Sequence, residues 1–231
     1  MKRFWNTVSV EPVDGGWQVM LDGRGVRTQG QRAQIVSQRK LADLLAAEWE
    51  DQGEEIDPAT FVHRDMADYA IDMIATGEED IVAKLLVFLE TDTLCYRADP
   101  DEPLYRRQLE VWEPIVTRFE ARENLSIERA SGIVHRAQPE PTLATMRTRV
   151  AAIEPMAQAA LFALTSLSAS LIIGLEALEG DEADDTLWDA ANLEEDWQVE
   201  LWGEDAEAAA RRAKWRAEFR RALVFAKAAR G

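Results

Sequence analysis

The chain has little cysteine and little histidine, and this scarcity excludes several classes of site. Its 231 residues include one cysteine, Cys95, and two histidines, His63 and His135. A single cysteine cannot form an intramolecular disulfide, which suits a reducing compartment. The two histidines lie far apart in the sequence, and neither has a second ligand at helical spacing. We therefore expect no zinc site and no other bound metal.

Motifs for nucleotide binding and for nucleophilic catalysis are also missing. The glycines Gly23 and Gly25 lack the third glycine and the strand-to-helix context of a dinucleotide-binding fingerprint. No Walker-type glycine loop and no Gly-x-Ser-x-Gly elbow occurs. A calcium loop over residues 181–192 fails, because Ala183 stands at a ligand position. We therefore expect no cofactor.

Positive charge is scarce, and one long stretch has none. The chain carries 26 basic and 43 acidic residues, a net charge of −17, so it has no overall attraction for nucleic acid or for an anionic membrane. Between Arg149 and Arg211 lie 61 residues without Lys or Arg but with 15 acidic residues, and the rest of the chain is nearly balanced. Residues 208–231 carry +7, and we expect this basic segment to fold back onto the acidic one.

Only one uncharged run is long enough to suggest a membrane span, and it occupies residues 155–175. It contains Gln158 and Thr165, has Glu154 and Glu176 at its flanks, and lacks a positive flank on either side. A helix of small residues buried inside a bundle fits this composition better, so we expect no stable membrane insertion. No apolar h-region of a secretory signal follows the N-terminus.

The predicted fold is α+β. β-Branched residues at 7–10, alternation over 17–21 and glycine turns between them predict an antiparallel meander, which residues 33–36 extend. Helical periodicity dominates afterwards, and 125–137 fits either short strands or an irregular crossing. We predict a small β-rich domain over 1–60 and a larger all-helical bundle over 61–231. The last predicted helices cover 142–153, 155–178, 185–202 and 205–229.

One short acidic segment also holds tryptophans. Helical spacing stacks Leu193, Trp197 and Leu201 on one face, with Glu194 and Gln198 in the adjacent row. A carboxylate that borders tryptophans is suited to recognise a basic side chain on a partner. The alternative is that the tryptophans are ordinary core residues.

The same segment allows a catalytic interpretation, in which Glu194 and Asp196 share acid–base work in a hydrolase. Such a pair must face across one pocket, whereas these two positions point about 200° apart on an ideal helix. A third interpretation is a general acidic adaptor that binds many unfolded proteins.

Several short motifs occur in a fixed order over residues 2–205. They are Lys2-Arg3-Phe4-Trp5, Leu21-Asp22-Gly23-Arg24, Glu48-Trp49-Glu50-Asp51-Gln52, Ala70-Ile71-Asp72, the eight residues from Thr91 to Ala98, and Leu193-Glu194 with Gln198 and Trp202-Gly203. This ordered set resembles the Atp-twelve family, which are assembly chaperones for the alpha subunit of the catalytic head of F-type ATP synthase. One departure is Phe61-Val62-His63, which is not the Met-Pro-Leu-like run expected there, so no role is transferred to it.

The resemblance implies a chaperone without catalytic activity. It would bind the unassembled alpha subunit, shield the surface later covered by the beta subunit, and leave on assembly. The acidic position of the C-terminal motif falls on Glu194, and we expect the client to contact Glu194, Glu195, Trp197, Gln198 and Trp202. We expect a monomer in the bacterial cytoplasm, or in the mitochondrial matrix if the chain is a processed eukaryotic form.

Overall fold

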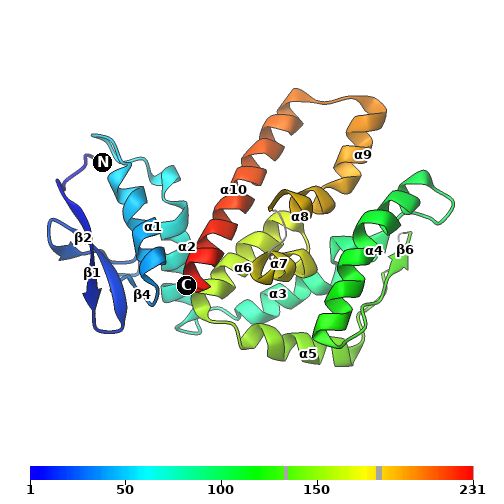
Figure 1. Ribbon diagram of the computed structural model, residues 1–231, viewed down its shortest axis with the longest axis horizontal. Coiled ribbons are helices and arrows are strands. Elements are labelled where there is room, and N and C mark those ends of the chain that lie inside the picture. The colour runs from blue at the N-terminus through cyan, green and yellow to red at the C-terminus, as the bar shows by residue number, and fades with distance from the viewer. Residues whose placement is uncertain (133–134, 181–183, 231) are drawn as a thin grey trace. The chain divides into compact units, whose positions relative to one another are not determined.

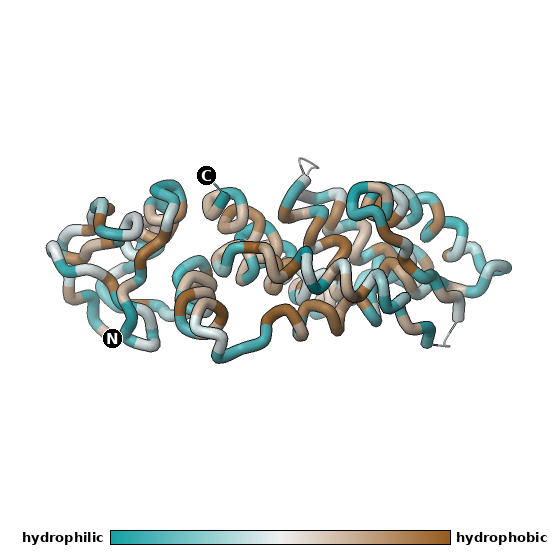
Figure 2. Tube along the Cα trace, turned by 90° about the horizontal axis from the view of Figure 1, so that it is seen from below, coloured by the Kyte–Doolittle hydropathy of each residue, from teal (hydrophilic) through white to brown (hydrophobic). Residues whose placement is uncertain are grey.

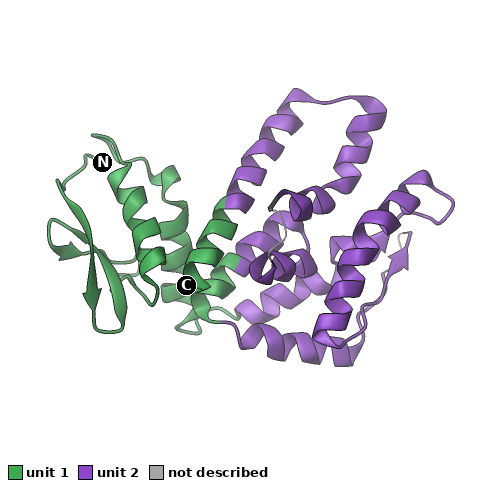
Figure 3. Ribbon diagram, viewed as in Figure 1, with its two compact units in different colours: residues 1–80, 154–160, 221–231 green, residues 81–153, 161–220 purple. Residues whose placement is uncertain are grey.

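The computed structural model describes residues 1–132, 135–180 and 184–230. These residues form two compact units, drawn in two colours in Figure 3. Unit 1 consists of Met1–Asp80, Glu154–Ala160 and Arg221–Gly231, and unit 2 consists of Ile81–Ile153 and Leu161–Arg220. The predicted boundary at residue 60 concerns independently folding domains and stays a prediction.

Unit 1 is built on a small antiparallel sheet of β1 (Val8–Val13), β2 (Gly16–Leu21), β3 (Arg24–Gly25) and β4 (Ile35–Val36). Strand β2 pairs with each of the other three, and Figure 1 shows it beside β1. The tight turn after β2 has positive φ at both Asp22 and Gly23, which matches the right-handed twist of a hairpin. The sheet confirms the predicted meander and its extension.

An aromatic core holds the first helix of unit 1 in place. Helix α1 (Arg39–Glu50) buries Trp49, whose ring lies 5.0 Å from Trp5 and 4.6 Å from Phe61. These edge and tilted ring contacts stabilise the unit beyond the burial of apolar area alone. The chain continues through η1 (Pro58–Thr60), α2 (Val62–Tyr69) and the single π-helical turn η2 (Ala70–Ile74).

Unit 2 is helical apart from one short strand pair, and two of its helices run on into unit 1. Its helices, with α6 and α10 as the two shared ones, are α3 (Ile81–Glu90), η3 (Thr93–Cys95), α4 (Pro103–Glu123), α5 (Glu140–Ala151), α6 (Pro155–Ser168), α7 (Leu171–Glu179), α8 (Asp184–Ala191), α9 (Leu193–Trp202) and α10 (Ala206–Arg230). Strand β5 (Tyr96–Arg97) pairs in parallel with β6 (Ala130–Ser131). The ambiguous segment 125–137 therefore contains a strand at 130–131, and its residues 133–134 lie outside the described residues. The α+β prediction is confirmed.

Two of the long predicted helices are each a pair of shorter ones. The predicted helix over 155–178 breaks at Ala169, which has φ +50°, and Ser170 then caps α7 by accepting a hydrogen bond from the Ile173 N–H at 3.0 Å. The predicted helix over 185–202 breaks at Asn192. Apolar periodicity continues across such interruptions of one or two residues, so the spacing alone did not reveal them.

The apolar run around α6 and α7 belongs to the core of unit 2. Every residue from Leu171 to Leu178 is buried, and Trp112, Trp188 and Phe219 are among the largest fully buried side chains. Figure 2 shows how apolar stretches recur along the helices between polar ones. Among the described residues, no helix is both long enough and apolar enough to cross a membrane.

Candidate functional site

Helix α9 carries the residues that the sequence singled out, and α4 holds it from one side. The Gln108 side-chain amide of α4 donates a hydrogen bond to a Glu194 carboxylate oxygen at 2.7 Å. The Arg107 guanidinium forms an ion pair with Glu200 at 3.0 Å. Just before α9, the Ala190 carbonyl accepts a hydrogen bond from the indole of the fully buried Trp112 at 2.7 Å. Three polar contacts therefore fix α9 and its approach to α4.

Gln108 also joins two motifs that are distant in the sequence. Its side chain is 0% exposed, and its carbonyl oxygen accepts a hydrogen bond from the Ala98 backbone N–H at 2.9 Å. Its amide reaches Glu194, which is 86 residues further along the chain. The end of the Thr91–Ala98 motif and the start of the α9 motif are thus linked through one buried amide. No sequence signal pointed to Gln108, because nothing in the spacing relates it to either motif.

The other end of the Thr91–Ala98 motif is held by Asp92, which is 0% exposed. Its carboxylate accepts hydrogen bonds from the Ser170 hydroxyl at 2.7 Å, the Ile172 N–H at 3.1 Å and the Leu94 N–H at 3.1 Å. Burial raises the pKa of Asp92 to about 6, against the effect of these hydrogen bonds. The motif therefore connects the junction between α6 and α7 to helix α9.

The two carboxylates considered for hydrolysis face different helices. Glu194 lies against Gln108 of α4, whereas Asp196 forms an ion pair with Arg212 of α10. Desolvation raises the pKa of Glu194, and the hydrogen bond from Gln108 acts in the opposite direction. The arrangement does not place the pair across a common pocket, which a two-carboxylate mechanism requires.

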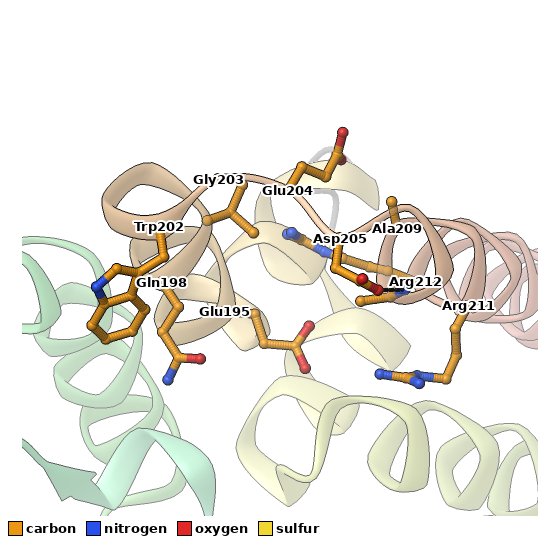
Figure 4. A pocket seen from close by; sticks show the side chains of 11 residues that line it. Glu195, Gln198, Trp202, Gly203, Glu204, Asp205, Ala209, Arg211 and Arg212 are labelled. Atoms are coloured by element: carbon orange, nitrogen blue, oxygen red, sulfur yellow. Dashed lines mark hydrogen bonds between the residues drawn. The ribbon is translucent and has the colours of Figure 1, made fainter.

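A cavity of about 310 Å³ lies between α9 and α10, where Gly203 turns the chain with φ +86°. Figure 4 shows Glu195 and Gln198 of α9 and Arg211 and Arg212 of α10 around it. Its lining consists of Glu195, Gln198, Val199, Trp202, Gly203, Glu204, Asp205, Ala208, Ala209, Arg211 and Arg212. Helix α9 thus has one side that contacts α4 and another that lines this cavity.

The five residues predicted to contact a client are divided between those two sides. Glu194 reaches α4, while Glu195, Gln198 and Trp202 line the cavity and Trp197 is half-buried. Trp202 is 78% exposed, so it is not an ordinary core residue. Leu201 and Val199 add exposed apolar surface at 55% and 37%. The client contacts themselves stay a prediction.

Several acids of unit 2 form ion pairs with arginines of α4 and α10, whereas, among the residues described, the acids that line this cavity do not. Arg118 and Arg122 of α4 form ion pairs with the buried Glu176 at 2.9 and 2.7 Å. Asp185 of α8 pairs with Arg216 and Arg220 of α10, so the expected folding-back of the basic segment is confirmed. Within the described part of the chain, no ion pair reaches the acidic side chains that line the cavity, namely Glu195, Glu204 and Asp205.

Comparison with known sequences gives one family match and a curated relative. The sequence profile described as "ATP12 chaperone protein" matches residues 2–120. The relative is the mitochondrial protein atp12 of Schizosaccharomyces pombe, which is 25% identical over 224 residues, covering 89% of this chain and 75% of the relative.

Two solved structures are similar over almost the whole chain. Atp12 from Paracoccus denitrificans is 32% identical with a TM-score of 0.92, covering 99% of this chain and 98% of its own. A protein of Agrobacterium tumefaciens, described as a candidate chaperone, is 35% identical with a TM-score of 0.92, covering 98% of this chain and 85% of its own. These likenesses extend over both compact units.

Proposed function

The chain belongs to the ATP12 chaperone family, and from this membership we propose that it is an ATP synthase assembly chaperone whose client is the unassembled alpha subunit. It binds alpha before the catalytic head forms, covers the surface that the beta subunit later covers, and leaves when beta arrives. It has no catalytic role of its own. Its relatives come from bacteria and from a mitochondrion, so we place it in the bacterial cytoplasm or the mitochondrial matrix.

One structural observation carries the proposal of a client site on α9. Trp202 is 78% exposed beside carboxylates that no ion pair reaches in the described residues, whereas acids such as Glu176 and Asp185 of unit 2 are each paired with two arginines. An exposed aromatic ring with uncompensated charge around it is typical of an interaction surface. The five residues proposed to contact alpha are Glu194, Glu195, Trp197, Gln198 and Trp202.

The chemistry of such a surface suits a transient chaperone. A subunit without its partner exposes an apolar interface that aggregates. The chaperone has to cover that interface and yet release it, so a moderate interface with a polar rim is more suitable than a large obligate one. The high net negative charge of −17 keeps the free chaperone from associating with itself.

Co-expression with the alpha and beta subunits, each alone, tests the client. We expect alpha to co-purify with the chaperone and to stay soluble, and we expect beta to do neither. Addition of folded beta to the purified complex should release the chaperone. Equal capture of both subunits would instead support the general acidic adaptor, and failure to capture alpha would overturn the proposal.

A charge reversal on α9 tests the site. Glu194→Lys should reduce capture of alpha, while Glu50→Lys, at an exposed acid at the end of α1 in unit 1, should not. Circular dichroism and the thermal midpoint of both variants establish that the fold is retained. Full capture by a correctly folded Glu194→Lys protein would remove Glu194 from the site without affecting the client assignment.

A further inference from the structure

The cavity between α9 and α10 combines apolar walls with charged side chains, and this chemistry indicates what kind of group it can bind. Its walls are mostly apolar or small where α9 meets α10, with Val199 and Trp202 on one side and Ala208 and Ala209 on the other. A volume of about 310 Å³ is at the lower end of the range for small-molecule pockets, and it suits one or two side chains of a partner.

Among the charged side chains that line this cavity, those without an ion pair to another described residue are mostly acids. Glu195 and Glu204 have no ion pair within the part of the chain that the structure describes, and Asp205 caps α10 by accepting a hydrogen bond from the Ala208 N–H at 2.8 Å. Arg212 is already paired with Asp196. The Arg211 guanidinium lies 5.5 Å from the centre of the Trp215 ring, in a cation–π contact.

From this arrangement we propose that the cavity seats one apolar side chain of the client next to a lysine or arginine of the same segment. The apolar side chain packs against Trp202 and Val199 and fills the space in front of Ala209. The neighbouring cation meets Glu195 and Glu204, which form no ion pair in the described residues. The proposal rests on the proposed client, and it adds the chemistry of the client segment and the place where it binds.

Two features of the cavity favour a basic segment over other occupants. Three carboxylates of the lining (Glu195, Glu204 and Asp205) have no ion pair in the described residues, against one guanidinium, Arg211, so complementarity selects a positive partner. Figure 4 also shows the Glu195 carboxylate extending toward the space between the helices rather than along the surface of α9. A cation bound beside Glu195 stays largely exposed to water, and its side chain also contacts the Trp202 ring.

A pair of matched tryptophan substitutions on α10 tests the apolar part of the proposal. Ala209→Trp fills the cavity, whereas Ala217→Trp adds the same ring at an exposed position of α10 outside the lining. In titrations of the full chain against purified alpha subunit, we expect Ala209→Trp to weaken binding at least about tenfold and Ala217→Trp to leave it within about twofold. Equal affinity of the two variants would overturn the proposal.

A double charge reversal tests the electrostatic part. Glu195→Arg with Glu204→Arg should weaken alpha binding about tenfold or more and reduce its dependence on salt concentration. Tighter binding would indicate an anionic partner and overturn the proposal. Both positions are exposed, so the fold should persist, which circular dichroism checks.

Overlapping short peptides that cover the alpha sequence then identify the segment. Peptides retained by wild-type protein but lost by Ala209→Trp should contain an apolar residue close to a lysine or arginine. Retention of acidic peptides would contradict the proposal. Self-association of wild-type protein that Ala209→Trp abolishes, without any effect on alpha, would assign the cavity to a second copy of the chain and also overturn it. If wild-type protein does not capture alpha at all, the proposed client fails first, and that result is seen without any variant.

Discussion

Two groups of acids in unit 2 differ in their burial and in the groups that contact their carboxylates. Asp92 and Glu176 are buried, and hydrogen bonds or arginines surround their carboxylates. Glu195 and Glu204 are exposed beside the α9–α10 cavity and have no ion pair among the described residues. Charge density along the sequence therefore does not indicate which charges are available to a partner. Availability depends on which acids the arginines of α4 and α10 reach.

The two groups should differ most in how much stability the protein loses when one acid of each group is replaced by alanine. Asp92→Ala leaves the Ser170 hydroxyl and two backbone N–H groups buried without an acceptor, so we expect the free energy of unfolding to fall by about 3 kcal/mol or more. Glu204→Ala should change it by less than about 0.5 kcal/mol. Urea denaturation of both variants gives the comparison, and similar losses would show that the two groups are not distinct.

The second-largest expected effect is the dependence of stability on pH, which follows from the pKa of the buried Asp92. Because burial raises the pKa of folded Asp92 from 3.8 to about 6, the folded state holds this proton more tightly than the unfolded chain does. Its contribution to stability is therefore greatest below the unfolded pKa and decreases as pH rises to about 6. We expect the stability of wild-type protein relative to Asp92→Asn to fall by about 2–3 kcal/mol over that window. A difference that does not vary with pH would contradict the raised pKa.

A smaller loss of stability is expected at Glu194, which is exposed like the second group but accepts a hydrogen bond from the buried Gln108. Gln108→Leu deprives the Glu194 carboxylate and the Ala98 N–H of their partner, so stability should fall by about 1–3 kcal/mol. Glu194→Gln keeps an oxygen acceptor and should cost less than about 1 kcal/mol. Hydrogen exchange at the Ala98 amide should accelerate in the first variant only. Unchanged protection there would argue against a link through Gln108.

The smallest effect is expected for the ion pair of Asp196 with Arg212, whose burial lies between that of the two groups. Both side chains are partly exposed, and such pairs contribute little. A double-mutant cycle with Asp196→Ala and Arg212→Ala should give a coupling of about 0.2–1 kcal/mol that decreases in high salt. A much larger, salt-independent coupling would place this pair with the buried acids.

The sequence predicted the main architecture because local patterns determine it. Alternating residues and glycine turns predicted the sheet of unit 1, and the 3.6-residue period predicted most helices of unit 2. The breaks at Ala169 and Asn192 were missed because the apolar period continues across both, and the first also involves a contact with a distant part of the chain. The hydrogen bond from the Ser170 hydroxyl to Asp92 at the first break is one such contact, and its partners are 78 residues apart.

The candidate site was predicted in part for the same reason. Helical spacing identified α9 as a helix that carries acids and tryptophans, and the ordered motifs indicated the family, which the comparisons confirm. Spacing did not show that Glu194 and Glu195 serve different neighbours. That distinction depends on where α4 and α10 lie, and no local pattern contains this information.

The bridge through Gln108 has a consequence for the order in which the protein becomes competent during synthesis. Its last partner, Glu194, leaves the ribosome 86 residues after Gln108 itself. Until then the amide has no carboxylate to hold, α9 has no fixed direction, and the cavity with α10 does not exist. The proposed client surface can therefore form only after nearly the whole chain has emerged, and a chain truncated before α9 should not bind the proposed client.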